Sequence, residues 1–563
     1  MIMSNKEIAA VLKSYAKLLE LHNENDFKVR SYNNAAFRIE RQSEPVSELD
    51  DDGIHAIQGV GKNTVAKVRS IIEVGSFDDL DDLMDITPGG VVEMMSIKGV
   101  GPKKISVLWR ELGIETPGEL LYACNENRLV SLKGFGEKTQ KSIREAIEFT
   151  LANADLYHFA FADIAFNDLR EVIGTDVFTN NILPCGAFHR KCEVVRSIDL
   201  VSSFDRSEMK GLFNVPDIEL IEDTEIKLSY RYKDGLPVHI HLVKSENLAV
   251  EQFLLTGSDE HIKALRSVGE LDTAIKQSRS DREIYAALGL QYIEPEIREG
   301  KGEVEAASKN MIPELIRYSD IKGSLHNHST YSDGNNTLRE MAEYCRDMGL
   351  EYLGICDHSK SAFYANGLSE ERIREQHAEI DELNKLLAPF HIFKGIESDI
   401  LNDGSLDYSE DVLDSFDFVV ASVHSNLRMD IEKATNRILN AVRNPHTTIL
   451  GHPTGRLLLA RQGYPIDHKM VIDTCAEHGV VIELNAHPYR LDLDWRWIKY
   501  ATSVGVKISV NPDAHATSGF HDMYYGVCAG RKGFLRSSDT LNCLSLSEIQ
   551  SFFLSRKGSE VKN

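Results

Sequence analysis

The sequence predicts a chain of several domains, with a repeated helical motif near its N-terminus and a parallel α/β barrel at its C-terminus. Its 563 residues are too many for one hydrophobic core, so we expect three or four domains. A glycine-containing turn recurs three times at intervals of roughly 40 residues, which indicates an internal repeat. The last 240 or so residues hold six short apolar runs, nearly all of which end at a side chain that can bind metal.

The repeated turn consists of an apolar residue, a glycine, a second apolar residue and a second glycine, and each copy opens an amphipathic helix. A single Gly-x-Gly turn usually marks only a tight bend, but three spaced copies are typical of helix-hairpin-helix elements. Such elements hold DNA phosphates through backbone N–H groups at a helix N-terminus, so a net charge of -24 does not exclude DNA binding. The six expected DNA-binding residues are Gly59, Gly61, Gly99, Gly101, Gly134 and Gly136.

Residues 5–75 resemble the small N-terminal domain of family X DNA polymerases, with Phe27-Lys28-Val29-Arg30-Ser31-Tyr32 similar to its second helix. We therefore expect an all-α domain over residues 1–75 and a further helix-hairpin-helix region, similar to fingers, over residues 76–150. In that family a lysine after the first hairpin can form a Schiff base during deoxyribose-phosphate removal, and Lys67 lies at the matching position. An exposed helical lysine is ordinarily a solvated charge, so lyase activity stays open.

Residues 151–310 resemble the α+β palm and thumb of the same nucleotidyltransferase family. The family uses a Gly-Ser-x-x-Arg turn to hold the triphosphate and three carboxylates to hold two magnesium ions. Here the turn is Gly186-Ala187-Phe188-His189-Arg190, and the carboxylate positions hold Ser197, Asp199 and His239. One carboxylate cannot hold two divalent ions beside a triphosphate. We therefore expect a degenerate polymerase site that folds and positions DNA.

In the C-terminal region, short buried strands alternate with helical stretches, and reactive groups follow the strands at their C-terminal ends, as in a parallel α/β barrel. A lone histidine or aspartate at a strand end is more often structural, but 13 of the 20 histidines lie between His326 and His521. The constellation therefore indicates a metal centre. Its nine expected ligands are His326, His328, Asp333, His358, Glu397, His424, His452, Asp513 and His515.

The chemistry of these ligands narrows the choice of metal. Imidazoles and carboxylates without thiolates suit zinc, manganese or iron. Nine ligands exceed what one ion can use, so we expect two or three divalent ions with Glu397 as the bridging carboxylate. Such a cluster lowers the pKa of a bound water and holds the oxygens of a phosphoryl group during in-line attack.

The segments Leu325-His326-Asn327-His328, Asp357-His358-Ser359 and Ser422-Val423-His424-Ser425 resemble the polymerase-and-histidinol-phosphatase (PHP) domain. Gly404-Ser405-Leu406-Asp407-Tyr408 resembles the form fused to bacterial and archaeal family X polymerases. This resemblance, which covers essentially the whole chain, implies a distorted (β/α)7 barrel over residues 321–563, a trinuclear metal site and phosphoesterase activity, typically of the 3′-5′ exonuclease type. Ser324 stands where the family commonly has an acidic residue, and it is not carried over as a ligand.

Two residues are expected to act in catalysis, Glu397 as the bridging ligand and Arg456 as a clamp on phosphate oxygens. Arg456 lies in the family segment Gly451-His452-Pro453-Thr454-Gly455-Arg456. Arg461 and Arg490 are further candidates, for which a surface salt bridge is the alternative. Trp495 and Trp497 are expected to pack and not to stack on bases.

Composition favours a cytoplasmic protein. No apolar run is long enough to span a bilayer, and the eight cysteines show no close paired spacing, so we expect reduced, mostly structural thiols. A monomer is the default expectation. The expected partner is DNA, at ends, gaps or damaged duplex, and no membrane.

The sequence predicts a metal-dependent phosphoesterase that processes DNA 3′ ends in repair, on a family X scaffold whose polymerase site is inactive. It does not separate exonuclease from apurinic-site or 3′-phosphatase action. One alternative is a gap-filling DNA polymerase with PHP proofreading, which would use Asp199 with unusual ligands. A second is a small-molecule phosphatase of the histidinol-phosphate type, against which the three hairpins argue.

Overall fold

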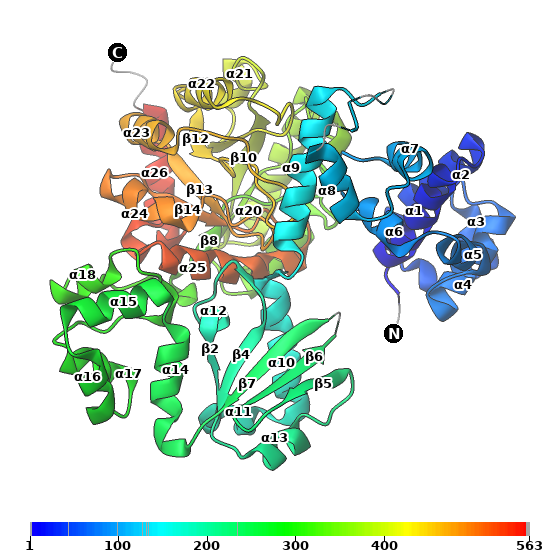
Figure 1. Cartoon of the computed structure of the whole chain (residues 1–563). Coiled ribbons are helices and arrows are strands. Elements are labelled where there is room, and N and C mark those ends of the chain that lie inside the picture. The colour runs from blue at the N-terminus through cyan, green and yellow to red at the C-terminus, as the bar shows by residue number, and fades with distance from the viewer. Residues whose placement is uncertain are drawn as a thin grey trace. The chain divides into compact units, whose positions relative to one another are not determined.

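The computed structural model describes residues 3–42, 44–97, 99–125, 128–130, 132, 134–233 and 235–558. The chain divides into two compact units, residues 1–155 and residues 156–563 (Figure 1). None of the helices in the described ranges has the length and apolar character that crossing a membrane requires. All eight cysteines are free thiols.

The N-terminal unit is entirely helical, as predicted. Its core is formed by one apolar face from each of several helices, including Leu12 and Tyr15 of the first helix and Ile105 and Leu108 of the seventh. Ser4 begins the first helix with a capping box in which its side chain and that of Glu7 each accept from the other's backbone N–H. The helices are α1 (Asn5–Leu21), α2 (Asp26–Glu40), α3 (Asp51–Ala56), α4 (Lys62–Val74), α5 (Asp78–Asp85), α6 (Gly89–Met94), α7 (Pro102–Leu112), α8 (Pro117–Asn125) and α9 (Glu137–Asn153).

The second unit begins with a mixed five-stranded sheet in the order β2-β4-β7-β6-β5, in which β4 and β7 are parallel and the other pairs antiparallel. Its seventh strand alternates between inward apolar residues, Val238 and Ile240, and the half-buried His239 and His241 on the other face. The strands, with the separate pair β1 and β3, are β1 (Tyr157–His158), β2 (Ile182–Cys185), β3 (Val194–Val195), β4 (Ile198–Ser202), β5 (Ile218–Asp223), β6 (Lys227–Tyr232) and β7 (Leu236–Leu242).

The earlier helices of this region share the apolar core of the sheet, and the later helices, nearer in sequence to the barrel, form a separate apolar cluster. Phe159 and Phe166 of α10 pack against the sheet residues Leu200 and Val238. The helices are α10 (Phe159–Ile173), α11 (Thr175–Asn180), α12 (Gly186–His189), α13 (Arg206–Leu212), α14 (Leu248–Thr256), α15 (Asp259–Val268), α16 (Leu271–Gln277), α17 (Asp281–Ala287) and α18 (Glu303–Ser308).

The C-terminal region is a seven-stranded parallel barrel in which the strands follow one another in chain order from β8 to β14. A parallel bridge between Asn327 and Ala514, just beyond β8 and β14, joins its two edges. The predicted (β/α)7 barrel is therefore confirmed. The strands are β8 (Gly323–Ser324), β9 (Tyr352–Ile355), β10 (His391–Asp399), β11 (Phe418–Ser422), β12 (Thr447–Leu450), β13 (Val481–Asn485) and β14 (Ile508–Asn511).

One helix follows each barrel strand, and a further helix closes the chain. Buried apolar side chains of these helices and of the strands form the main core of the barrel. The helices are α19 (Leu338–Asp347), α20 (Glu370–Leu386), α21 (Glu410–Leu413), α22 (Ile431–Val442), α23 (His468–His478), α24 (Trp495–Ser503), α25 (Met523–Lys532) and α26 (Leu546–Gly558). The 3₁₀ helices are η1 (Val46–Glu48), η2 (Ser245–Asn247), η3 (Pro295–Ile297), η4 (Tyr318–Asp320), η5 (Phe363–Ala365), η6 (Thr517–Asp522), η7 (Ser537–Asp539) and η8 (Leu541–Cys543).

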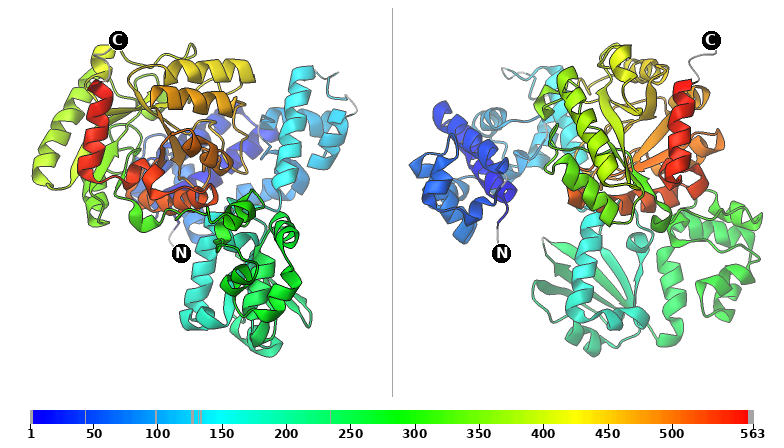
Figure 2. Two further views of the ribbon diagram at one scale, coloured as in Figure 1. Left: turned by 90° about the vertical axis from the view of Figure 1, so that its left-hand side faces the viewer. Right: turned by 180° about the vertical axis from the view of Figure 1, so that it is seen from behind.

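The last helix, α26, is drawn in red in Figure 2 and lies beside the barrel strands. Its Ile549 and Phe553 belong to a second apolar cluster with side chains from several strands. The ring of Phe553 stacks on that of Phe418 with centroids 4.9 Å apart. This packing fills the interior of the barrel and leaves the C-terminal ends of the strands for polar residues.

Candidate metal centre and nucleic-acid interface

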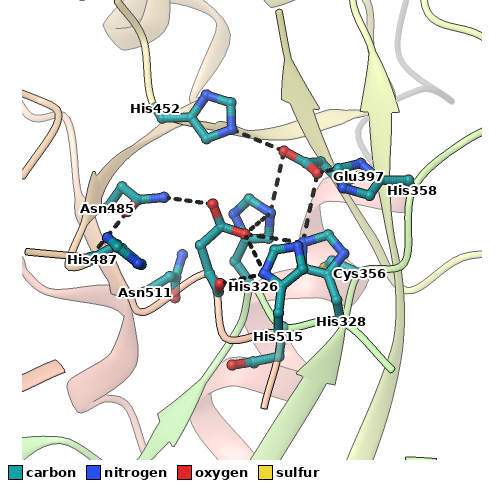
Figure 3. Close-up of polar contacts among 12 residues, drawn as sticks. His326, His328, Cys356, His358, Glu397, His452, Asn485, His487, Asn511 and His515 are labelled. Carbon is teal, nitrogen blue, oxygen red and sulfur yellow. Dashed lines mark hydrogen bonds and ion pairs between the residues drawn. The ribbon is translucent and has the colours of Figure 1, made fainter. Parts of the chain in front are cut away.

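The nine expected metal ligands lie within β10 or in the segments that directly follow the barrel strands, and the fold brings them together. Figure 3 shows six of them, the imidazoles His326, His328, His358, His452 and His515 and the carboxylate Glu397, pointing toward one another. Strand C-terminal ends meet at one end of a parallel barrel, which explains how ligands from six different strands converge.

Glu397 occupies the centre of this group and is 1% exposed. Its Oε2 lies 2.9 Å from Nδ1 of His358 and 3.7 Å from Nε2 of His328. Its Oε1 lies 3.0 to 3.3 Å from the Nε2 atoms of His326, His424 and His452. Both oxygens therefore face imidazoles on different sides, which is the arrangement a bridging carboxylate needs.

Potential ligand atoms within 4.8 Å of one another form three overlapping groups, all of them in the barrel when only the described residues are considered. His328 belongs to two of the groups, and His358 also belongs to two. The groups are His328, Asp333, His358 and His515; His326, His328 and Asp513; and His358, Glu397 and His424. The overlap is what a cluster of ions with shared ligands requires.

Several buried ligand atoms have no partner in hydrogen-bond geometry among the described residues, even where an oppositely charged group lies close. They are Nε2 of His326, Nδ1 of His328, Nδ1 of His358, Oε2 of Glu397 and Nδ1 of His452. A buried polar atom without a partner costs about 1 to 3 kcal/mol, so such a concentration of them needs compensation. Divalent cations would provide it, and the donor set therefore fits metal binding.

The electrostatics couple the carboxylates and imidazoles of this group: burial opposes both shifts, but the nearby carboxylates raise the pKa of His424 to about 10 and that of His515 to about 9. Burial lowers the pKa of His328 to about 3, so its imidazole is neutral. Burial alone would raise the pKa of Glu397, but the imidazoles of His424, His326 and His358 hold it well below its ordinary range. Burial would likewise raise the pKa of Asp513, and the imidazole of His326 is the main group that holds it well below its ordinary range. Ionised carboxylates beside imidazoles suit transition metals and zinc.

Two further carboxylates orient the histidines and were not among the predicted site residues. Nδ1 of His326 donates to Oε1 of Glu483 at 2.7 Å, and the backbone N–H of His452 donates to Oε2 of the same residue at 2.8 Å. Nδ1 of His424 donates to Asp399. Such contacts fix the tautomer and aim Nε2 at the metal. Glu483 ends an apolar run as the ligands do, which is the signal that could have identified it.

Arg456, expected to clamp phosphate oxygens, is engaged by groups that follow β13. Its Nε donates to the backbone oxygen of Arg490 at 2.9 Å, and its Nη2 donates to that of Leu491. Its Nη1 donates to Asp494 at 2.5 Å. All three nitrogens are thus engaged, so Arg456 holds the loop after β13. Arg490 on that loop has its Nε 3.7 Å from Oδ2 of Asp513, which makes it the better-placed cation for a phosphate.

The remaining side-chain expectations concern packing and local contacts. Trp495 is 5% exposed and belongs to the barrel core, and the ring of Trp497 stacks on His468 with centroids 4.8 Å apart. Both tryptophans therefore pack, as predicted. Arg461 donates twice to the backbone oxygen of Gly455, which engages it inside its own loop.

The three glycine turns of the N-terminal unit share one backbone geometry. The first glycine of each turn, Gly59, Gly99 or Gly134, has a φ of 89°, 89° or 91° respectively, which favours glycine. The second glycine is the N-cap of α4, α7 or α9, and no side chain caps any of these helices. A Cβ on Gly59, Gly61, Gly101, Gly134 or Gly136 would meet no atom within 4 Å. The turns therefore present backbone N–H groups without a covering side chain.

Lys67, on α4, is held by neighbours instead of being solvated. Its ammonium group pairs with Asp79 and lies 4.4 Å above the ring of Phe77 and 5.3 Å from that of Tyr15. The ion pair is the main cause that lowers the pKa of Asp79. Schiff-base chemistry at Lys67 would first have to break this ion pair.

The positions expected to hold the polymerase carboxylates also lie together, on one face of the mixed sheet. Asp199 and His239 are register partners on β4 and β7, and Oγ of Ser197 donates to Oδ2 of Asp199 at 2.9 Å. Nδ1 of His239 lies 3.0 Å from the hydroxyl of Ser229. Burial lowers the pKa of His239, so the imidazole is neutral. One carboxylate thus stands where the family uses three.

The turn expected to hold a triphosphate is engaged elsewhere. Nη1 of Arg190 donates to the backbone oxygen of Thr256 at 2.7 Å, and its Nε donates to Glu299 at 3.0 Å. Nδ1 of His189 lies 3.0 Å from the hydroxyl of Thr256. The guanidinium and imidazole of the turn therefore bind protein groups in the place of phosphate.

Family models match three parts of the chain. Residues 3–77 match a helix-hairpin-helix domain, residues 91–148 a SAM-like helix-hairpin-helix tandem, and residues 324–487 the PHP domain. These matches coincide with the glycine turns of the helical unit and with the strands that carry most of the metal-ligand candidates.

Known proteins extend the similarity over the whole chain. The chain is 34% identical to the DNA polymerase/3′-5′ exonuclease PolX of Bacillus subtilis (strain 168), over 98% of this chain and 99% of that protein. A probable phosphatase of Thermoanaerobacter sp. (strain X514) is 31% identical over 34% of this chain and 78% of its own length. A probable phosphatase of Vibrio atlanticus (strain LGP32) is 28% identical over 35% of this chain and 79% of its own length.

Proposed function

Because this chain belongs to the family of the DNA polymerase/3′-5′ exonuclease PolX, we propose that it hydrolyses phosphoester bonds at DNA 3′ ends with its barrel and no longer polymerises DNA. One observation carries the proposal: the barrel gathers nine candidate metal ligands, Glu397 among them, whereas the palm keeps a single carboxylate, Asp199. The finer division into residues 1–75, 76–150, 151–310 and 321–563 belongs to the same proposal, as does the monomeric state.

The cofactors proposed are two or three manganese, zinc or iron ions. His326, His328 and Asp513 would hold one, His358, Glu397 and His424 a second, and Asp333 with His515 would complete a third. His452 would add its Nε2 beside Glu397. Such ions supply an activated water and neutralise the charge that develops on the phosphoryl group.

The protein's own residues arrange this chemistry. Glu483 and Asp399 fix the orientation of two ligand imidazoles through their Nδ1–H groups. Arg490, next to Asp513, is placed to donate to a non-bridging phosphate oxygen, where a planar guanidinium can form two parallel hydrogen bonds. Arg456 anchors the loop that carries Arg490.

DNA binding is assigned to the three hairpins. Their glycine turns leave the first-turn N–H groups of α4, α7 and α9 uncapped by side chains, and these groups can hold phosphates regardless of base sequence. This mode does not need a basic protein, which reconciles DNA binding with the net charge of -24.

The proposal is tested with three end-labelled duplexes that carry a 3′-hydroxyl, a 3′-phosphate or an internal apurinic site. Each is incubated with manganese and either the wild-type protein or the His326→Ala, Glu397→Ala double variant. We expect shortening or dephosphorylation by the wild type and its loss in the variant. The substrate that reacts fastest identifies the end chemistry. Equal activity of the two proteins would rule out the barrel as the working site.

A further inference from the structure

A short loop beside the metal centre exposes two aromatic rings. Residues 359–368 connect β9 to α20, and the 3₁₀ helix η5 within them carries Phe363 and Tyr364. Phe363 is 87% exposed and Tyr364 is 54% exposed. Single exposed apolar residues are common on proteins, so exposure alone indicates nothing. The conformation of the loop and its position give these two rings their significance.

The backbone of the loop is fixed at many points. The N–H of Leu368 donates to the backbone oxygen of His358 at 2.9 Å, and the N–H of Gly367 donates to that of Ala362 at 3.1 Å. A Cβ on Gly367 would lie 1.9 Å from the backbone oxygen of Ser359, so the two ends of the loop are in close contact. The rings are therefore exposed by a specified backbone and not by a loose one.

The same loop is bonded to a residue that orients a metal ligand. The hydroxyl of Ser361 donates to Oδ2 of Asp399 at 2.7 Å, and its N–H donates to Asp407 at 2.6 Å. Asp399 accepts from His424 through its other oxygen, Oδ1. The loop thus has a defined position relative to the metal centre.

Tyr364 lies at the edge of that centre. Its ring centroid is 6.4 Å from that of His358 and 6.1 Å from that of Phe363, and the Phe363 and Tyr364 planes meet at 77°. Burial raises the pKa of Tyr364, and the carboxylates Asp399, Glu397 and Asp333 raise it further while Arg490 opposes them. The ring of Tyr364 therefore lies beside a candidate ligand imidazole at the edge of the centre.

We propose that Phe363 and Tyr364 form a stacking platform for the unpaired base of the nucleotide at the DNA 3′ end, whose phosphodiester is cleaved at the metal centre. The inference rests on the proposed function. The ring of Phe363 has no group that could bind a phosphate or a metal, but every nucleobase offers a face on which an aromatic ring stacks. Rings adjacent to the ligands are placed where the terminal nucleoside of a bound phosphodiester would lie.

The proposal defines a substrate class. Stacking does not depend on base identity, so any of the four terminal nucleotides is accepted. Stacking on aromatic side chains raises affinity roughly 10- to 100-fold, and a terminal sugar without a base should bind more weakly by that factor.

The test compares two single-stranded oligonucleotides that differ only at the 3′ end, one with a terminal thymidine and one with a terminal abasic tetrahydrofuran. We measure kcat/KM with manganese for the wild type and for the Phe363→Ala, Tyr364→Ala double variant. In the double alanine variant, the ratio of kcat/KM for the thymidine end to kcat/KM for the abasic end should fall about 10-fold or more. The fall should come mainly from a higher KM for the thymidine end. The ring-preserving double variant Phe363→Tyr, Tyr364→Phe should keep the preference.

An equal loss on both oligonucleotides would show a merely structural role and overturn the inference, as would an unchanged preference. Should the double alanine variant not fold, the single Phe363→Ala variant decides, because removing a ring that is 87% exposed leaves the core intact. The His326→Ala, Glu397→Ala variant is run in parallel. Cleavage that persists in the metal-ligand variant contradicts the proposed function itself. If cleavage is lost in that variant but the Phe363→Ala, Tyr364→Ala variant keeps the end preference of the wild type, only the platform is contradicted.

Discussion

Glu397 shows how one side chain can organise the whole metal centre. It lies on β10, between β9 and β11 in the barrel, and its two oxygens face imidazoles that follow β8, β9, β11 and β12. Replacing it removes the bridging donor without changing the ligands around it. A single substitution at Glu397 can therefore separate an effect on metal binding from an effect on folding.

We expect Glu397→Gln to lower both the bound metal and the phosphoesterase activity. The amide has nearly the same shape but carries no charge and donates where the carboxylate accepts, so metal affinity should fall by about 100-fold or more, beyond the effect of losing an outer-shell partner. Elemental analysis of the dialysed protein gives the metal content per chain. Glu371→Gln on the exposed face of α20 is the matched control. Wild-type metal content in Glu397→Gln would contradict the bridging role.

A second prediction concerns a residue that does not touch the metal. Glu483→Gln should weaken metal binding by about 10- to 100-fold, because His326 loses the charged acceptor that sets its tautomer. Isothermal titration calorimetry of the metal-free protein with manganese measures this loss of affinity. Activity should return at high manganese concentration, since the nine proposed ligands remain. A variant that stays inactive at saturating metal would show that Glu483 does more than orient His326.

At the scale of elements, the hairpins show how the two glycines of one turn differ in task. Gly59 has a left-handed backbone that other residues adopt only with strain, whereas Gly61 has φ -84° and ψ 166°, an extended N-cap conformation open to any residue. The same division holds for Gly99 and Gly101. Stability and DNA binding can therefore be changed separately.

We expect the triple substitution Gly61→Asp, Gly101→Asp, Gly136→Asp to weaken DNA binding without destabilising the protein. Aspartate is a better N-cap than glycine by a few tenths of a kcal/mol, so the melting temperature should be equal or slightly higher. Its charge would meet the DNA phosphates at all three turns, which should reduce affinity at least about 10-fold. Fluorescence anisotropy with labelled duplex measures the affinity.

The matched control for this prediction is the triple serine variant at the same positions. Serine also caps the helices but adds no charge, so it should bind DNA closer to the wild type. Unchanged affinity in the aspartate variant would show that these helix N-termini do not contact phosphate.

At the scale of the whole molecule, the palm and the barrel are joined by buried ion pairs. Nζ of Lys532, at the end of α25, donates to Glu299 at 2.5 Å and to the backbone oxygens of Glu296 and Arg190 at 3.1 Å. Nε of Arg531 donates to Glu296 at 2.9 Å. Arg190, of the turn that was expected to hold a triphosphate, is thus part of the junction.

We expect Lys532→Met to destabilise the junction. Removing one partner of a buried ion pair costs about 3 to 5 kcal/mol when the other charge is left alone, and somewhat less here because Glu299 keeps Arg190. The additional change Glu299→Gln should recover part of the loss. Thermal unfolding of the two variants measures the difference. Equal melting temperatures for the wild type and Lys532→Met would contradict the importance of the pair.

The sequence predicted the barrel and the position of its ligands because both are local signals: an apolar strand followed at once by an imidazole or carboxylate. It could not give roles that depend on distant partners. Glu483 is an orienting group because His326 lies opposite it, and Arg456 anchors a loop because the backbone of residues 490–491 lies within its reach. The closure of the barrel by Asn327 and Ala514 is likewise a contact between distant segments.

The most direct test of a working barrel on a retired palm is a single reaction on a 3′-recessed labelled duplex with manganese and all four deoxynucleotides. The wild type, Asp199→Ala and the His326→Ala, Glu397→Ala double variant are compared side by side. The account predicts shortening by the wild type and by Asp199→Ala, and an unchanged primer with the double variant. Primer extension by the double variant that is lost in Asp199→Ala would contradict it, because the palm would then be a working polymerase.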